Sequence, residues 1–209
     1  MVTPGPPPVP APAGGPRQLV LVGLPASGKS SAAALVAERL GLPHLDSDAW
    51  VEQTTGQPIS DIFARDGEDA FRRLEERAVA ELLARPQAVV SLGGGAVLSP
   101  ANRQRLAAHD VVWLQVSVAT ATRRAGLNRL RPLLLGDVRR QLERLETERR
   151  PLYEAVADYR VATDRLTPDE VALAVLRLTG RTATGTGQGL AEAAAVGAPA
   201  AGGGGDGHV

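Results

Sequence analysis

The stretch GLPASGKS, residues 23–30, combines the residue types that bind phosphate groups. It fits the pattern G-x-x-x-x-G-K-[ST], with Gly23, Gly28, Lys29 and Ser30 at the fixed positions. Glycines let backbone N–H groups wrap around phosphates, and a following helix adds its positive dipole end. In such a loop the lysine reaches the β- and γ-phosphates, and the serine hydroxyl is offered to Mg²⁺. The stretch therefore predicts a nucleoside triphosphate site.

Two observations argue against a chance glycine-rich turn. The loop lies between an apolar run at 18–22, which predicts a strand, and an alanine-rich run at 30–40, which predicts a helix ending at Gly41. Lys29 is also the only lysine among 23 basic side chains, so the other 22 are arginines. A compact ammonium suits a tight ring of backbone groups better than the wide, planar guanidinium does.

Two carboxylates, Asp46 and Asp48, follow the apolar segment 42–46. Side chains two residues apart on extended backbone point the same way, and the carboxyl edge of a parallel sheet is where ligands bind. One carboxylate then holds Mg²⁺ through water and the other binds the hydroxyl that accepts phosphate. The alternative is a helix N-cap for the segment starting at Ala49, and one aspartate could serve both purposes.

Three consecutive glycines, Gly93 to Gly95, follow the apolar run 88–92. They favour close approach of the backbone to a ligand, and a tight strand-to-helix turn is the alternative. Trp50, beside the aspartate pair, is either a pocket residue or a core residue, whereas His44 and His109 are expected to be structural.

The arginines are harder to assign, because a solvated surface is the ordinary position of each one in an arginine-rich chain. Sequence spacing alone does not choose among Arg72, Arg73, Arg131, Arg149 and Arg150.

The elements that must position these residues alternate along the chain. Strands are predicted at 18–22, 42–46, 88–92, 110–116 and 160–163. Helices are predicted at 30–40, at 67–86 and from residues 119 and 137, with an end at Pro86 and a break near Pro151. Two more helices are predicted from their caps. One follows Ser60 or Asp61, and the other follows Thr167 and has Pro168 at its first position. This alternation predicts an α/β fold with a mainly parallel sheet.

Composition limits the remaining function classes. The length of 209 residues favours one domain, at 17–180, between a proline-rich tail at 1–16 and a Gly/Ala-rich tail at 181–209, both expected to be disordered. A net charge of zero gives no basic excess for nucleic acid or anionic membranes, and the absence of cysteine excludes disulfides and fits a cytoplasmic protein. No apolar run approaches the ~20 residues of a membrane span. A core of this size without an NKxD-type motif favours a small-molecule or nucleotide kinase over a GTPase.

The motifs taken together resemble those of shikimate kinases. The likeness runs through LVLVGLPASGKSS, LDSDAWVEQTTGQPISDIFARDGEDAFRRLE, VVSLGGGAVLSP, LRPLLLG and RRPLYEAVADYRV, in this order. It implies a three-layer P-loop kinase fold with a five-stranded parallel sheet flanked by helices and a small mobile lid. It further implies a monomeric, cytoplasmic enzyme that uses ATP and Mg²⁺ to phosphorylate the 3-hydroxyl of shikimate in chorismate and aromatic amino-acid biosynthesis.

The resemblance also implies a role for each matching position. The ATP-binding residues would be Ala26, Ser27, Gly28, Lys29, Ser30, Ser31, Arg124 on the adenine, and Arg131 in the lid. Mg²⁺ would be held by Ser30 and Asp46, and shikimate by Asp48, Arg72, Gly93, Gly94, Gly95 and Arg149. The catalytic residues would be Lys29, Asp48 and Arg131. A gluconate-kinase-like or nucleotide kinase and a non-catalytic P-loop module are the competing hypotheses, and Ala26 departs from the glycine that many relatives carry.

Overall fold

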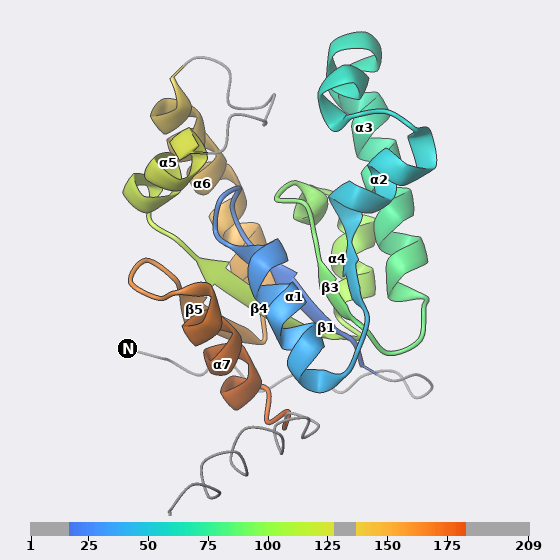
Figure 1. Ribbon diagram of the computed structural model, residues 1–209. Coiled ribbons are helices and arrows are strands. Elements are labelled where there is room, and N and C mark those ends of the chain that lie inside the picture. The colour runs from blue at the N-terminus through green and yellow to red at the C-terminus, as the bar shows by residue number, and fades with distance from the viewer. Residues whose placement is uncertain (1–16, 128–136, 183–209) are drawn as a thin grey trace, which may run out of the picture.

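The computed structural model describes residues 17–127 and 137–182 (Figure 1). Its centre is a five-stranded parallel sheet in the order β2-β3-β1-β4-β5, which confirms the predicted sheet. The strands are β1 (Leu19–Val22), β2 (His44–Asp46), β3 (Val89–Ser91), β4 (Asp110–Gln115) and β5 (Tyr159–Ala162). Because β1 is the central strand, the phosphate loop that follows it emerges in the middle of the carboxyl edge.

Helices cover both faces of the sheet and give three layers (Figure 1). The helices are α1 (Lys29–Leu40), α2 (Ser47–Thr55), α3 (Ile59–Leu83), α4 (Pro100–Leu106), α5 (Val118–Leu127), α6 (Val138–Val156) and α7 (Pro168–Leu178), with a short 3-10 turn η1 (Ala96–Leu98). Helices α1 and α7 pack together on one face, whereas α3, α4 and α6 contribute to the core of the other.

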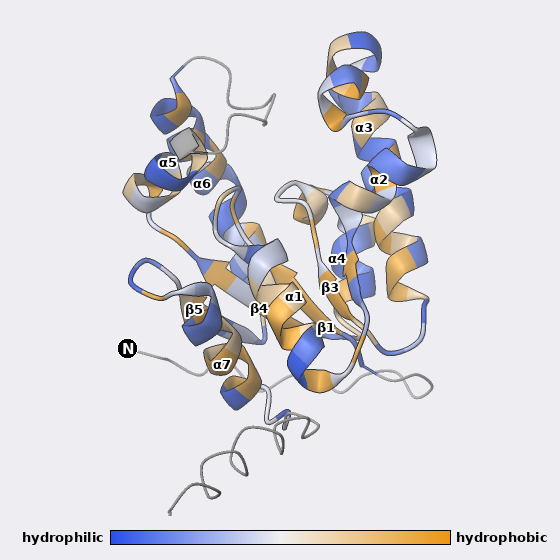
Figure 2. Cartoon of the chain, in the orientation of Figure 1, coloured by the Kyte–Doolittle hydropathy of each residue, from blue (hydrophilic) through white to orange (hydrophobic). Residues whose placement is uncertain are grey.

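The core follows from the alternation of side chains along the central strand. Leu19 and Leu21 point to the α1–α7 side, and Val20 and Val22 point to the opposite side. All four are buried, as expected for a parallel strand covered on both faces, and apolar residues concentrate in these strands in Figure 2. Within the two described ranges, no helix is long and apolar enough to cross a membrane.

Helix ends test the predicted caps. Gly41 ends α1 with a left-handed φ of 63°, as predicted, and Thr167 begins α7 in a capping box with Glu170. The predicted cap at Ser60 or Asp61 is wrong, because α3 begins at Ile59 and neither side chain caps it. The Glu52 carboxylate of α2 accepts the first amide of the helix, from Ile59, at 3.0 Å.

Two predicted helix boundaries also differ from the structure. The helix predicted at 67–86 ends earlier than expected, at Leu83, whereas its predicted start agrees with a kink at Gly67, whose φ and ψ of 80° and 176° are not helical and separate it from the first turns of α3. The predicted break near Pro151 is absent, since α6 continues through it to Val156. A proline removes one backbone donor, and the burial of Tyr153 just beyond it holds the last turns in place. Helix α4 was not predicted.

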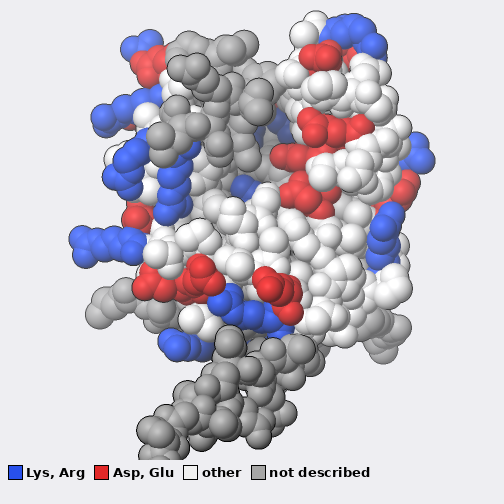
Figure 3. All heavy atoms as spheres, in the orientation of Figure 1, with Lys and Arg blue, Asp and Glu red and all other residues white. Residues whose placement is uncertain are grey.

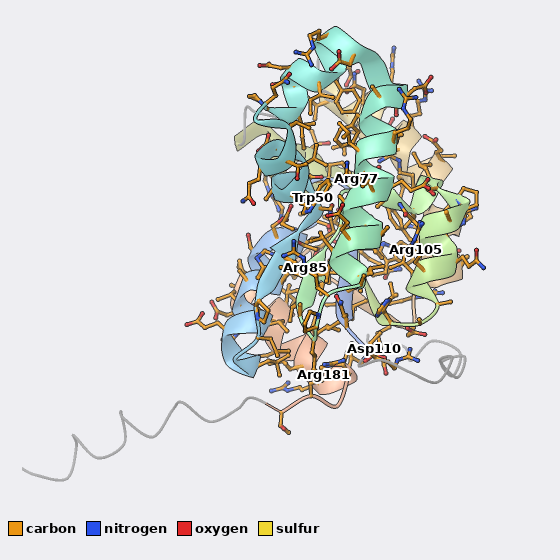
Figure 4. The ribbon with its side chains drawn as sticks, turned by 90° about the vertical axis from the view of Figure 1, so that its right-hand side faces the viewer. Trp50, Arg77, Arg85, Arg105, Asp110 and Arg181 are labelled. Atoms are coloured by element: carbon orange, nitrogen blue, oxygen red, sulfur yellow. The ribbon has the colours of Figure 1, made fainter. Side chains whose placement is uncertain are left out.

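An arginine–aspartate cluster joins the two ends of the described fold. Arg17, before β1, donates from Nε to Asp110 Oδ1 at 2.6 Å. Arg181 donates from Nη2 to the other Asp110 oxygen at 2.7 Å and to the Arg17 carbonyl at 3.0 Å. Asp110 and Arg181 lie close together at the base of the molecule in Figure 4, at the sheet edge opposite the phosphate loop. Arg181 lies one residue beyond the predicted domain end.

Removal of the Arg181 side chain should therefore destabilise the fold. Arg181→Ala deletes the hydrogen bonds to the Asp110 carboxylate and to the Arg17 carbonyl. We therefore expect the free energy of unfolding to fall by about 1–2 kcal/mol and the Tm, measured by calorimetry, to fall by a few degrees. Arg177→Ala is the matched control, because Arg177 is an exposed arginine of α7. Equal, small shifts in the two variants would contradict a stabilising role for the cluster.

Candidate active site

The phosphate loop connects β1 to α1 and holds its lysine inside. Lys29 is buried, and its Nζ donates to the carbonyls of Gly23 at 2.9 Å and Leu24 at 2.8 Å. The loop needs left-handed backbone at Ala26 (φ 63°) and Gly28 (φ 93°). The ammonium is thus pre-positioned at the centre of the loop, beside the backbone groups that form a phosphate-binding nest.

A pocket of about 420 Å³ opens beside this loop. It is lined by Ala26, Ser27, Gly28, Lys29, Ser30, Ser31, Arg124, Thr163, Leu166, Pro168 and Val171. Arg124 of α5 donates to the Thr163 carbonyl at 2.7 Å and to the Thr163 hydroxyl at 3.3 Å, and it lies 3.5 Å from the Ala26 carbonyl oxygen. The structure therefore brings together all the predicted nucleotide residues that it describes, whereas Arg131 lies outside the described residues.

Asp46 links the phosphate loop to α2. Its Oδ2 accepts hydrogen bonds from the hydroxyls of Ser30 at 2.8 Å and Ser91 at 2.6 Å. Its Oδ1 accepts the backbone amides of Asp48 at 2.9 Å and Ala49 at 3.1 Å, so it is also the N-cap of α2. The N-cap interpretation is confirmed for Asp46, although the helix begins at Ser47 and not at Ala49.

Hydrogen bonding keeps the Asp46 carboxylate charged. Burial alone raises the pKa of Asp46, but the bonds from Ser91, Ser30 and the two backbone amides outweigh it, and the pKa is lowered overall. His44 contacts Asp46 indirectly, through Ser91, because its Nε2 lies 2.9 Å from the Ser91 hydroxyl. It is a structural partner of the carboxylate, in line with the sequence expectation.

These oxygens suit a magnesium ion that is shared with a nucleotide. Among residues 17–127 and 137–182, no group of three or more His, Asp or Glu side chains could hold a metal alone. Mg²⁺ commonly binds through one or two protein oxygens, several waters and substrate phosphates. The adjacent Ser30 hydroxyl and Asp46 carboxylate provide that donor set.

The glycine run after β3 packs against charged side chains. A Cβ atom at Gly93 would lie 2.6 Å from Asp48 Oδ1 and 2.7 Å from Glu75 Oε1, and one at Gly95 would overlap the Arg72 guanidinium. Side chains at these positions would therefore displace Asp48, Glu75 or Arg72. Gly93 and Gly95 therefore allow the backbone to come close to Asp48 and Arg72, which the sequence assigns to the acceptor.

Glu75 is a functional candidate that the sequence analysis missed. It is buried, and its Oε2 accepts a hydrogen bond from Arg72 Nη1 at 2.6 Å. Burial raises the pKa of Glu75, and the charge of Asp48 adds to the rise, whereas Arg72 and Arg149 oppose it. The available signal was the spacing, because a carboxylate three residues after an arginine lies on the same helix face.

Arg149 of α6 lies beside Asp48, Arg72, Glu75 and the glycines 93–95. These residues are called the acceptor group below. The Arg149 side chain is buried, and within the described residues its Nε and Nη1 have no hydrogen-bond partner. Buried polar groups are normally satisfied, and a buried guanidinium needs an anion or another acceptor. Its charge acts on Glu75, which places it beside the Asp48–Arg72 group. The arrangement suits a ligand carboxylate.

The other sequence candidates lie outside this group. Arg73 is exposed on α3, and Arg150 forms an ion pair with Glu146 at 2.6 Å on the surface of α6. Trp50 is part of the core, and the Arg77 guanidinium lies 5.9 Å from its ring centroid. Both residues are labelled in Figure 4. Arg73 and Arg150 are therefore surface residues, and Trp50 is a core residue.

A second pocket, of about 570 Å³, lies between α3 and the segment of η1 and α4. It shares Arg72 and Glu75 with the acceptor group, but the phosphate loop takes no part in it. Arg105, labelled in Figure 4, lines its other end. Its size alone does not make it the site of chemistry.

The phosphate loop and the acceptor group are neighbours. A Cβ at Gly94 would lie 3.1 Å from Pro25 Cδ and 3.3 Å from the Gly23 carbonyl oxygen, so the two glycine-containing loops touch. Figure 3 shows acidic side chains gathered over α2 and α3 and arginines projecting over α5 on the same face. The fold has three layers around a parallel sheet, and its phosphate loop is centred on a lysine. The adjoining acceptor group has charges of both signs. These features define a P-loop kinase for a small molecule.

Comparison with known proteins identifies the family. A shikimate kinase family model matches residues 25–179. The shikimate kinase of Thermobifida fusca is 49% identical over 153 residues, which is 73% of this chain and 89% of that protein. The shikimate kinase of Mycobacterium tuberculosis (strain ATCC 25177 / H37Ra) is 51% identical over 158 residues, or 75% and 90%.

Solved structures agree with the sequence relatives. The shikimate kinase of Acinetobacter baumannii, in complex with shikimate, matches with a TM-score of 0.75 at 33% identity, covering 78% of this chain and 93% of that one. The enzyme of Aquifex aeolicus matches with a TM-score of 0.68 at 29% identity, covering 78% and 96%. This chain belongs to the shikimate kinase family, whose activity is the ATP-dependent phosphorylation of shikimate.

The lowered pKa of Asp46 makes its contribution to stability sensitive to acid. An unfolded aspartate has a pKa of about 3.9, and the folded value is lower. The ionised carboxylate therefore stabilises the fold above pH ~3.9, and this stabilisation is lost as the pH falls through the folded pKa.

Urea unfolding of wild type and Asp46→Asn between pH 7 and pH 3, without nucleotide or Mg²⁺, measures this contribution. The free-energy advantage of wild type should shrink as the pH falls. Asp69→Asn, at an exposed position of α3, is the matched control. An advantage that stays constant over this range would mean that charge on Asp46 is unimportant for stability.

Proposed function

We propose that this chain transfers the γ-phosphoryl group of ATP to the 3-hydroxyl of shikimate through the residues of the site described above. The observation that carries the proposal is the buried Arg149, whose Nε and Nη1 have no hydrogen-bond partner in the described part of the chain. It lies near Arg72 and Asp48, beside a phosphate loop. Two guanidinium groups and one carboxylate match an acceptor that carries one carboxylate and several hydroxyls.

In this proposal the nucleotide occupies the pocket beside the phosphate loop. The segment 26–31 binds the phosphates, with the Lys29 ammonium moving from the loop carbonyls to the β- and γ-phosphates. Arg124, held in place by Thr163, stacks on the adenine. Arg131 is proposed to contact the phosphates from the lid.

Ser30 and Asp46 would hold the magnesium ion, Ser30 directly and Asp46 through water. When bound, Mg²⁺ neutralises charge on the phosphate oxygens. The hydrogen bond between the two side chains, at 2.8 Å, keeps both oxygens on the same side of the phosphate loop.

Shikimate would lie across the glycine run after β3. Arg72 and Arg149 hold its carboxylate, which a planar guanidinium pairs with in a bidentate manner. Asp48 accepts hydrogen bonds from its hydroxyls, and the backbone of Gly93 to Gly95 approaches its ring. Glu75 holds Arg72 in position through the 2.6 Å bond.

The reaction breaks the bond between the γ-phosphorus and the bridging oxygen of ADP and forms a bond to the shikimate 3-oxygen, whose proton is released. The transition state of phosphoryl transfer is loose, so catalysis consists mainly of positioning and charge stabilisation. Lys29 and Arg131 supply positive charge near the transferred group. The main contribution of Asp48 is to orient the attacking hydroxyl, and it is the proposed acceptor of the proton.

The wider assignments follow the same proposal. The catalytic domain spans residues 17–180 and acts as a monomer in the cytoplasm, with neither nucleic acid nor a membrane as partner. Zero net charge, which gives no basic excess, supports the last two statements.

An acceptor panel tests the function directly. Purified protein with ATP and Mg²⁺ should release ADP with shikimate, at a rate far above background, and much more slowly with quinate, gluconate or nucleoside monophosphates. Product analysis should show a phosphate at the 3-oxygen. Good turnover of gluconate or a nucleotide, with none of shikimate, would reject the proposal in favour of another kinase activity.

Adjacent arginines on α6 allow a matched test of carboxylate recognition. Arg149→Lys keeps the charge but loses the bidentate fork, so the KM for shikimate should rise by about 10- to 100-fold, corresponding to about 1.5–3 kcal/mol, while the KM for ATP stays within about twofold. Arg150→Lys is the control, because Arg150 is paired with Glu146 on the surface. A defect confined to ATP in Arg149→Lys would move this residue to the nucleotide site.

A further inference from the structure

Tyr153 of α6 links two parts of the acceptor group that come from different segments of the chain. Its side chain is fully buried, and its hydroxyl donates a hydrogen bond to the Gly94 carbonyl at 2.6 Å. The Arg149 side chain, one helical turn earlier, lies close enough for its charge and a hydrogen bond to act on the same hydroxyl. One phenol thus contacts both the guanidinium and the glycine loop.

The ring of Tyr153 is held independently of these polar contacts. It stacks on Trp113 of β4 with centroids 5.8 Å apart and an interplanar angle of 28°. Trp113 is buried in the central sheet. Because Trp113 holds the ring against the sheet, the Tyr153 hydroxyl has a defined position relative to the sheet.

The hydroxyl is a permanent donor at working pH. Burial raises the pKa of Tyr153 well above its ordinary value, although the nearby Arg149 charge opposes the rise. The protonated phenol donates its one hydrogen to the Gly94 carbonyl and keeps lone pairs that can accept from a guanidinium.

Gly94 connects this contact to the phosphate loop. A Cβ added at Gly94 would lie 3.1 Å from Pro25 Cδ and 3.3 Å from the Gly23 carbonyl oxygen, so Gly94 also packs against the phosphate loop. A shift of Gly94 would therefore change the distance between the acceptor backbone and the phosphate donor.

We propose that Tyr153 is a positioning residue for the acceptor: its hydroxyl sets the Gly94 backbone and the Arg149 guanidinium in the relative arrangement that binds the shikimate carboxylate and ring beside the phosphate loop. This inference rests on the proposed function, in which Gly94 and Arg149 contact shikimate. Tyr153 itself touches no reacting atom. It acts through the two groups that its hydroxyl holds.

Tyr153→Phe is the direct test, because it keeps the ring that stacks on Trp113 and removes only the hydroxyl. The KM for shikimate should rise about tenfold, and the KM for ATP should stay within about twofold. A lower Tm with an unchanged KM for shikimate would overturn the proposal, since a purely structural hydroxyl predicts that result.

Tyr159→Phe is the matched control. Tyr159, on β5, is the other of the two tyrosines in the chain and packs on the α1–α7 side of the sheet. Its loss of a hydroxyl should change neither KM. An equal rise in the KM for shikimate in both variants would show that the effect is not specific to position 153, and would overturn the proposal.

A spectroscopic measurement covers the case in which Tyr153→Phe does not fold. With only two tyrosines in the chain, 3-fluorotyrosine labelling gives two ¹⁹F resonances, which Tyr159→Phe assigns. Saturating shikimate without nucleotide should shift the Tyr153 resonance, as Arg149 engages a carboxylate, and leave the Tyr159 resonance in place. An unmoved Tyr153 resonance would contradict the proposed coupling.

Turnover of shikimate by the wild-type enzyme separates the two hypotheses. If wild type phosphorylates shikimate while Tyr153→Phe is kinetically indistinguishable from it, the positioning role fails and the function stands. If wild type does not phosphorylate shikimate, the function fails and the positioning role fails with it.

Discussion

The close packing of two glycine-containing loops is the constraint on which both substrate sites depend. One loop follows β1 and the other follows β3, and these strands are parallel neighbours with Leu21 paired to Ser91. The loops therefore leave the sheet side by side. Gly94 touches Pro25 and the Gly23 carbonyl, which a larger residue at position 94 would push away. Phosphoryl transfer requires donor and acceptor within contact distance, and the sheet provides this by placing the two loops against each other, with no side chain at Gly94 to separate them.

Three of the charges around these loops are held by neighbouring groups before any substrate arrives. Lys29 is held by loop carbonyls, Asp46 by two hydroxyls and two amides, and Arg72 by Glu75. Such contacts satisfy buried charges at moderate cost and fix their geometry. Arg149 differs, because within the described residues two of its nitrogens have no partner. Because Lys29 and Arg72 already have partners, a ligand anion is directed to the Arg149 guanidinium.

The sequence predicted the parts of the site that depend on local pattern. The phosphate loop is contiguous, so its glycines, Lys29 and Ser30 are recognised by spacing, and the strand before it and the helix after it follow from composition. The role of Tyr153 depends on contacts across the fold with Gly94 and Trp113. Glu75 pairs locally with Arg72 on α3, but only the fold brings it against Gly93. Local propensity also misjudged Pro151, where tertiary packing keeps α6 continuous. Helix α4 is short, and its pattern is too weak to distinguish from a loop.

The single lysine of the chain marks the position where the shape of the cation matters more than its charge. Elsewhere arginine serves in ion pairs such as Arg150–Glu146 and Arg181–Asp110, where a planar fork and a long reach are useful. At position 29 the cation is buried, and the Gly23 and Leu24 carbonyl oxygens lie within 2.9 Å of its nitrogen. A guanidinium there would have to displace loop backbone that already touches Gly94. An arginine would therefore disturb the acceptor loop as well as the phosphate site, which couples the choice of one basic residue to the geometry of both substrates.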